Sequence, residues 1–172
     1  MGYTIRPMSL RDLPQVVSIE RDSFPSPWSA DYFRHEVTRN KISRYLVACE
    51  GNWVLGYIGV WLVVGEIHIT TIAVDKAQRR KGIGESLLIS VIELAYQHKA
   101  RFLTLEVREA NSPAWYLYAK YGFSEVGKRP RYYRDTDENA VIMTTEDIYS
   151  DSFQQLFQRL RQANTERSRG DY

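Results

Sequence analysis

Residues 67–88 read IHITTIAVDKAQRRKGIGESLL and combine three local signals in direct succession. Residues 67–74 are rich in β-branched side chains and predict a strand. From Ile83 onward, apolar residues recur at helical spacing and predict a helix. The segment between them is basic and contains two glycines, Gly82 and Gly84, that are one residue apart. The stretch therefore predicts a strand, a basic glycine loop and a helix, around which the rest of the chain can be placed.

The glycine loop has the properties of an anion-binding site. Its glycines let the backbone turn tightly and approach a ligand, and the unpaired amides at a helix N-terminus favour negative charge. Arg79, Arg80 and Lys81 add positive charge at the same place. A nest of amides suits a diphosphate, so a nucleotide-containing cofactor is the leading hypothesis. The alternative is a solvated helix cap without a ligand, because two glycines alone are a weak signal.

Composition restricts the protein to a few classes. The chain has 172 residues, 44% of them hydrophobic and 26% charged, which is typical of one globular domain with a substantial core. A formal charge of +2 gives no reason to expect direct nucleic-acid binding. Cys49 is the only cysteine, so an internal disulfide and a cysteine-rich zinc site are excluded, and we expect no metal. Without a signal peptide or an apolar run of about 20 residues, we expect a cytoplasmic protein that does not bind membranes.

Local patterns predict seven strands and four helices before residue 147. Two glycine-containing turns, at 51–52 and 64–65, join the second to fourth strands into an antiparallel meander. A helix separates the fourth and fifth strands, so these two should be parallel neighbours. The strands are expected at 3–8, 45–50, 53–63, 66–74, 102–108, 124–129 and 140–145. The helices are expected at 10–22, 30–39, 83–98 and 112–121.

Two further segments are predicted after residue 130. Residues 131–139 form a polar connection that is too long for a minimal hairpin, and long loops often carry function. Residues 151–164 predict an amphipathic helix, followed by a polar tail from Thr165. We expect this helix to pack on its own domain and to contribute stability rather than turnover. The alternative is a contact with the ribosome or another partner. Its apolar stripe consists of Phe153, Leu156, Phe157 and Leu160.

The glycine loop resembles the Arg/Gln-x-x-Gly-x-Gly/Ala acetyl-coenzyme A signature of the GNAT acetyltransferases, through Arg79, Gly82 and Gly84. Over residues 3–147 the chain resembles the RimI-type branch of that family, the ribosomal-protein-alanine N-acetyltransferases. Lys76, where a proline is common, and the helix after Asp147 depart from the family pattern. The other matching motifs are Ile72-Ala73-Val74, Leu105-Glu106-Val107-Arg108, Asn111, Leu117-Tyr118, Gly122-Phe123 and Tyr132-Tyr133.

This resemblance implies an α/β (α+β) fold with a mixed central sheet of about seven strands and flanking helices. The early strands would be antiparallel, and the two parallel central strands would splay apart. The acetyltransferase domain would span residues 1–148, and a helical extension with a polar tail would span 149–172. A monomer or a weak dimer is expected.

The resemblance also implies an activity, which is transfer of the acetyl group of acetyl-CoA to the free N-terminal amine of a protein. The expected substrate is the N-terminal alanine of a small-subunit ribosomal protein. By the same resemblance, Glu106 is the base, acting through water because a carboxylate is a weak base unless its environment raises its pKa. Tyr118 is the acid that protonates the leaving thiolate. The implied cofactor-binding residues are Ile72, Ala73, Val74, Arg79, Arg80, Lys81, Gly82, Ile83, Gly84, Glu85 and Asn111.

Each of the three polar site residues has a structural alternative. Glu106 could be the salt-bridge partner of an arginine, and Tyr118 could be one aromatic residue of a packed helix. Asn111 could serve only as a helix cap.

Aromatic residues are expected to line the acceptor site. Phe24 and Trp28 flank a connection that two prolines hold extended, and with Tyr132 and Tyr133 they would border a groove for a peptide N-terminus. The alternative for Phe24 and Trp28 is to fix two helices to the core. His68 is a candidate for the same site and for a share of the base role, although a lone histidine on a strand is more often structural.

Two other functions remain open on the sequence alone. An enzyme of the same fold could acetylate a small amine, since the fold does not determine the acceptor. A non-catalytic acyl-CoA-binding module could retain the fold, but it would need neither Glu106 nor Tyr118. An α-amine has a pKa near ~8 and a lysine near ~10.4, so a mild base favours an N-terminal acceptor.

Overall fold

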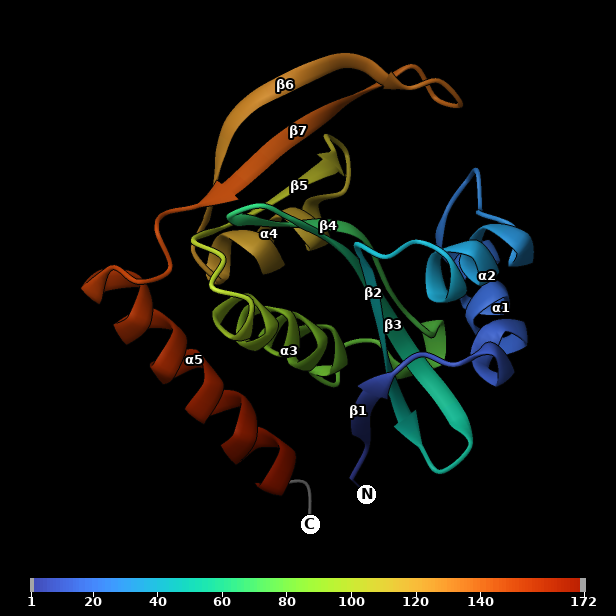
Figure 1. Ribbon diagram of the computed structural model, residues 1–172, viewed down its shortest axis with the longest axis horizontal. Coiled ribbons are helices and arrows are strands. Elements are labelled where there is room, and N and C mark those ends of the chain that lie inside the picture. The colour runs from blue at the N-terminus through green and yellow to red at the C-terminus, as the bar shows by residue number, and fades with distance from the viewer. Residues whose placement is uncertain (1, 171–172) are drawn as a thin grey trace.

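Seven strands form one mixed sheet in the computed structural model, which describes residues 2–170 (Figure 1). Neighbouring strands are antiparallel except β4 and β5, which are parallel. The predicted α/β fold with a mixed seven-stranded sheet is therefore confirmed. In spatial order the strands are β1 (Thr4–Pro7), β2 (Ser43–Glu50), β3 (Trp53–Val63), β4 (Glu66–Val74), β5 (Phe102–Arg108), β7 (Glu138–Thr145) and β6 (Phe123–Tyr133).

Helices cover both faces of the sheet and enclose two apolar cores. On one face, α1 (Leu13–Ser23) and α2 (Ala30–Thr38) pack with β2 and β3 around Phe33 and Tyr57, which are fully buried. On the other face lie α3 (Ile83–Gln97), α4 (Ser112–Lys120) and α5 (Asp151–Gly170) (Figure 1). The helical periodicity after Gly82 predicted the buried side of α3, which carries Leu87, Leu88, Val91, Ile92 and Ala95.

The parallel pair β4 and β5 stays together for only part of its length. Its register runs from Glu66 opposite Phe102 to Ile69 opposite Leu105. Beyond that point β4 continues beside β3 as far as Val74, whereas β5 continues beside β7 as far as Arg108. Residues 70–74 of β4 therefore have no ladder partner on their β5 side among the described residues, and the sheet opens at this point, as the resemblance implied.

The first predicted helix begins later than expected. Residues 10–12 form a short 3-10 turn (Leu10–Asp12), and the α-helix starts at Leu13. Pro14 is the cause, because proline lacks an amide hydrogen and its ring collides with the carbonyl of the preceding turn, so it is tolerated only at the start of an α-helix. Cys49 is buried and unpaired, as expected for a small core residue.

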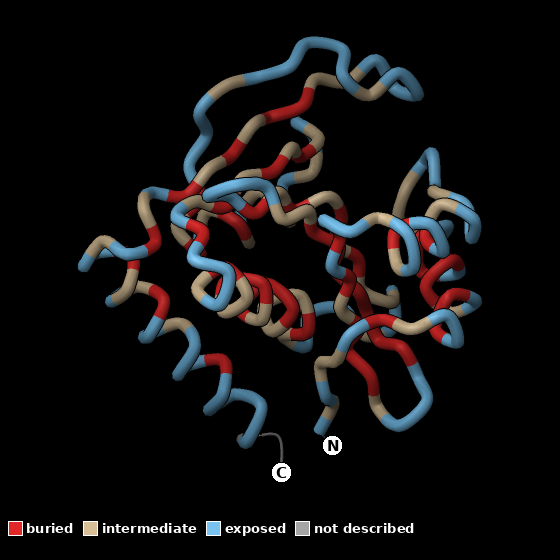
Figure 2. The backbone as a smooth tube through the Cα atoms, viewed as in Figure 1, coloured by how far each residue is buried: buried red, intermediate tan, exposed pale blue. Residues whose placement is uncertain are grey.

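The predicted long connection at 131–139 is wrong. Strand β6 extends to Tyr133 and β7 begins at Glu138, so a short turn joins a long hairpin. Strand β6 is the edge of the sheet, and most of its side chains are exposed (Figure 2). An exposed edge strand shows no alternation of apolar and polar residues, and Pro130 further weakened the strand signal.

Helix α5 is longer than the predicted 151–164, because it continues to Gly170 and includes the first residues of the expected polar tail. Residues 171–172 of the expected extension lie outside the described part of the chain. The helix packs on its own domain through Phe153 and Phe157, and only the side that faces α3 is buried (Figure 2). No helix in the described range 2–170 has both the length and the apolar composition needed to span a bilayer.

Replacing Phe153 by alanine should destabilise the fold strongly. Its ring is fully buried, and it lies so close to Gly122 that a Cβ there would come within 3.1 Å of it. The resulting cavity should lower the free energy of unfolding by about 3 kcal/mol. Urea denaturation followed by circular dichroism measures this change. Gln158→Ala, at an exposed position of the same helix, is the matched control. Equal denaturation midpoints for the two variants would contradict the packing described here.

Candidate active site

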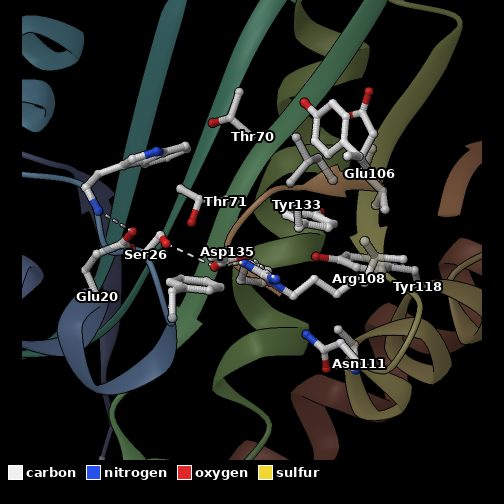
Figure 3. Close-up of a pocket in the computed structure, with 18 of the residues that line it drawn as sticks. Glu20, Ser26, Thr70, Thr71, Glu106, Arg108, Asn111, Tyr118, Tyr133 and Asp135 are labelled. Atoms are coloured by element: carbon white, nitrogen blue, oxygen red, sulfur yellow. Dashed lines mark hydrogen bonds and ion pairs between the residues drawn. The ribbon is translucent and has the colours of Figure 1, made fainter. Parts of the chain in front are cut away.

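A groove of about 460 Å³ lies where β4 and β5 separate. Residues 69–72 of β4 and 105–108 of β5 form its floor, and α4 closes one end through its N-cap Asn111, Ala114 and Tyr118. Its two walls come from the segment between α1 and α2 and from the end of the β6–β7 hairpin. Figure 3 shows side chains from all these elements converging on one space. A volume of this size is in the range of small-molecule sites.

Glu106 and His68 form a close pair across the two parallel strands. The distance from Glu106 Oε2 to His68 Nε2 is 2.6 Å, and Arg129 lies 3.5 Å from the other carboxylate oxygen. The hydrogen bond with His68 holds the pKa of Glu106 below its ordinary value, although burial opposes this shift. Glu106 is therefore charged at neutral pH. The local environment does not raise its pKa as a strong base would require, and the arginine contact that we considered as an alternative is present.

Tyr118 is buried in α4 and lines the groove. Its ring centroid lies 5.6 Å from that of Phe123, so the aromatic packing considered as an alternative is also present. Burial raises the pKa of Tyr118 above that of a free phenol. The hydroxyl therefore keeps its proton at neutral pH and can act only as a donor of that proton or as a neutral hydrogen-bonding group.

One wall of the groove is held by a buried carboxylate that sequence reasoning missed. Glu20 accepts a 3.1 Å hydrogen bond from the backbone N–H of Trp28 and another from the hydroxyl of Tyr57. Burial raises the pKa of Glu20. Phe24 and Trp28 line the groove on this side, and Trp28 also packs against α2. The spacing of Glu20 from Val16 and Val17 placed it on the apolar face of α1, and this was the signal that could have revealed it.

The opposite wall depends on Arg108, which belongs to the motif at residues 105–108 but is not among the predicted site residues. It donates two hydrogen bonds to Asp135, of 2.8 and 3.0 Å, and its guanidinium lies 4.0 Å from the centre of the Tyr133 ring. Ser26 donates a 3.0 Å hydrogen bond to Asp135, so the two walls are joined across the groove (Figure 3). The arginine lowers the pKa of Asp135 to about 2. Strand alternation puts Arg108 on the same face as Glu106, which could have indicated its role.

The glycine loop adopts the conformation that its sequence predicted. After a 3-10 turn (Lys76–Gln78), Arg80 and Gly82 both have left-handed backbones, with φ of 67° and 78°. Gly82 is the N-cap of α3 and has no side chain, so no side-chain acceptor caps the first-turn amides. Arg79 donates to the carbonyl of Val74 at 3.1 Å and therefore braces the loop against the end of β4.

The structure brings together only part of the predicted site. Asn111 lines the groove and also caps α4, accepting a 3.3 Å hydrogen bond from the amide of Ala114. His68 touches Glu106 but is not a lining residue. Ala73, Val74 and residues 79–85 also do not line this groove. The predicted residues that do line it are Phe24, Trp28, Ile72, Glu106, Asn111, Tyr118, Tyr132 and Tyr133.

Comparison with known families identifies the fold and its chemistry. Residues 13–123 match the Acetyltransferase (GNAT) family. The chain belongs to the GNAT acetyltransferase family. Both the splayed strands and the glycine loop lie inside the matched range, whereas α5 lies outside it.

Relatives of this GNAT acetyltransferase share most of its length. It is 42% identical over 139 residues to a Bacillus subtilis (strain 168) protein named provisionally as a ribosomal protein bS18-alanine N-acetyltransferase, covering 81% of this chain and 92% of that one. It is 33% identical over 144 residues to the Escherichia coli (strain K12) ribosomal protein bS18-alanine N-acetyltransferase, covering 81% and 95%.

Solved structures of similar proteins superimpose on most of this chain. The Escherichia coli ribosomal-protein-S18-alanine N-acetyltransferase superimposes with a TM-score of 0.77 at 30% identity, covering 85% of this chain and 94% of that one. Ard1 from Thermoplasma volcanium superimposes with a TM-score of 0.78 at 28% identity, covering 86% and 99%.

Asp135→Asn should loosen both walls of the groove. The change removes the charge that holds Arg108 and weakens the bond to Ser26, so amides in residues 24–28 and 131–137 should exchange hydrogen at least several-fold faster. Hydrogen exchange read by mass spectrometry measures this effect. Asp137→Asn is the matched control, since its pairing with Arg131 is long, at 3.8 Å, and exposed. Unchanged exchange in residues 24–28 would show that the Ser26–Asp135 bond does not restrain that wall.

Proposed function

We propose that this enzyme transfers the acetyl group of acetyl-CoA to the free α-amine of a protein N-terminus, namely the N-terminal alanine of ribosomal protein bS18, in the cytoplasm. The observation that carries the proposal is the groove itself, which runs between two aromatic walls to the pair of Glu106 and Tyr118. The names of the relatives supply the target protein.

The described residues fit acetyl-CoA. Residues 70–73 of β4 offer backbone groups without a ladder partner along the open side of the sheet, which can bond an amide-containing arm in the manner of an added strand. The uncapped amides of α3, together with Arg80 and Lys81, suit the diphosphate. Acetyl-CoA supplies a thioester, whose carbonyl carbon accepts the amine and whose sulfur leaves as a thiolate.

Glu106 and Tyr118 would divide the proton transfers between them. Glu106 is charged and faces the groove, so it can draw a proton from the acceptor ammonium through a water molecule, while His68 fixes its orientation from behind. Tyr118 holds its proton at Oη and can give it to the leaving sulfur, and the second proton that the nitrogen loses as the amide forms restores the phenol. An α-amine with a pKa near ~8 needs only a weak base at neutral pH, which agrees with the lowered pKa of Glu106.

Glu106→Gln should lower kcat at least ~100-fold, the usual contribution of a general base. The Kd for coenzyme A should change little, because the substitution conserves size. His68→Ala should reduce kcat less, by about tenfold. Because Glu106 stays ionised from pH 5 upward, the acid limb of the wild-type profile should follow the pKa of the substrate amine. Steady-state rates from pH 5 to 9 and calorimetry with coenzyme A test these points. A larger loss in His68→Ala than in Glu106→Gln would transfer the base role to His68.

The acceptor class can be tested with three substrates. A peptide that begins with alanine should be acetylated, whereas the same peptide with a blocked N-terminus and an internal lysine should not. Spermidine should react at less than a hundredth of the kcat/KM of the free peptide. Mass spectrometry locates the acetyl group on each product. Comparable efficiency with spermidine would identify a small-molecule acetyltransferase of the same fold.

A further inference from the structure

Two side chains from the last turns of α5 reach the glycine loop, although this helix lies outside the range of the family match. A Cβ placed on Gly82 would lie 3.5 Å from Nη1 of Arg167 and 3.6 Å from Nδ2 of Asn164. These two side chains are three residues apart and therefore share one face of the helix. The helix thus brings a guanidinium to the N-cap of α3, where the first-turn amides are open.

Asn164 holds this end of the helix in place. It is 8% exposed and accepts a 3.0 Å hydrogen bond from Ser86, in the first turn of α3. Ser86 in turn pairs with the hydroxyl of Tyr3 at 2.6 Å. Arg167 itself is half exposed at its side chain. The helix is therefore fixed beside the loop, while the guanidinium keeps open surface toward solvent.

A negatively charged side chain, Glu85, lies directly after the glycine loop. By itself, its charge would oppose the binding of an anion there. Glu85 lies in the first turn of α3, and its side chain is 11% exposed. Arg167 donates to it at 2.5 Å, Lys120 donates to the other carboxylate oxygen, and the hydroxyl of Tyr121 lies 3.2 Å away. Burial would raise the pKa of Glu85, but the bonds from Lys120 and Arg167 more than offset it and keep its pKa below the ordinary value.

A charged carboxylate beside the amides would repel a phosphate group if it were alone. Lys120 and Arg167 together place two positive charges against one negative charge, so the cluster as a whole is cationic. Arg167 has several N–H donors, and within residues 2–170 only Nη1 is engaged, with Glu85. A planar guanidinium with open donors is the side chain best suited to a phosphate.

We propose that Arg167 binds a phosphate group of coenzyme A, so that α5 completes the phosphate site at the glycine loop. The inference rests on the proposed use of acetyl-CoA. The same chemistry is present in the diphosphate and in the 3′-phosphate of the ribose. It also changes our expectation for α5, because deleting residues 152–172 should then weaken donor binding as well as stability.

Calorimetry with coenzyme A tests the proposal directly. In Arg167→Ala the Kd should rise about tenfold, the order expected for one charge-assisted hydrogen bond at a partly exposed site. Arg167→Lys should recover part of the loss, because it keeps the charge. Arg161→Ala is the matched control, since Arg161 also joins α5 to α3, through Glu93 at 3.3 Å, away from the glycine loop. Its Kd should equal that of the wild type.

Two further ligands separate a phosphate contact from a structural effect. Dephospho-coenzyme A lacks the 3′-phosphate, so a loss seen only with coenzyme A assigns the contact to that group, and equal losses assign it to the diphosphate. S-acetylpantetheine carries no phosphate in either position, and its kcat/KM as donor should be the same in Arg167→Ala and the wild type.

Several results would overturn the inference. An equal Kd for coenzyme A in Arg167→Ala and Arg161→Ala would contradict the proposed contact with a phosphate group. An equal loss of kcat/KM with S-acetylpantetheine would show that Arg167 only holds α5 in position. If Arg167→Ala does not fold, Glu85→Gln decides the question: it frees the guanidinium and should tighten coenzyme A binding, whereas unchanged or weaker binding contradicts the proposal. Failure of the wild type to bind coenzyme A would instead refute the proposed function.

Discussion

The loss of pairing between β4 and β5 after Ile69 and Leu105 is the constraint on which the rest of the site depends. Each of the two strands keeps its other neighbour, so the sheet stays intact while a gap opens between them. The gap creates the groove and leaves backbone groups of β4 unpaired on one side. It also places Glu106, at the point of divergence, beside the cavity rather than inside the sheet. Without this separation the same side chains would be ordinary members of a continuous ladder.

Charge around the groove is organised in pairs, which restricts what each residue can do. Glu106 is held by His68 and Arg129, and Asp135 is held by Arg108 and Ser26. These contacts keep both carboxylates ionised. Glu20 differs from them in the direction of its shift, because burial raises its pKa. The site therefore combines a fixed negative charge on the floor with a protonated phenol, Tyr118, in α4. That combination suits an acceptor whose own pKa is close to neutral.

Helix α5 stabilises the fold through its packing and also lies against the first turn of α3, beside the glycine loop. Its apolar half is held by Phe153 and Phe157, and its polar half is held by Asn164 and Arg167 against the first turn of α3. Both halves act on the same helix face, so the packing of one sets the position of the other. Because one helix end reaches the glycine loop, a segment outside the matched range of the family can influence the loop's electrostatics.

Local chemistry alone determined much of this protein. The β-branched run, the two glycines and the helical periodicity at 67–88 predicted β4, the loop and α3, because each depends on near neighbours in the chain. Resemblance to the family pointed to Glu106, Tyr118 and Asn111. Only the tertiary structure decided the pairing of Glu106 with His68, the bond between Ser26 and Asp135, and the approach of Arg167 to Gly82. These contacts join residues far apart in the chain, and no local pattern encodes them. The same reason explains the differences at β6 and at the end of α5, since the edge strand and the polar end of the helix are stabilised by distant partners rather than by an apolar stripe of their own.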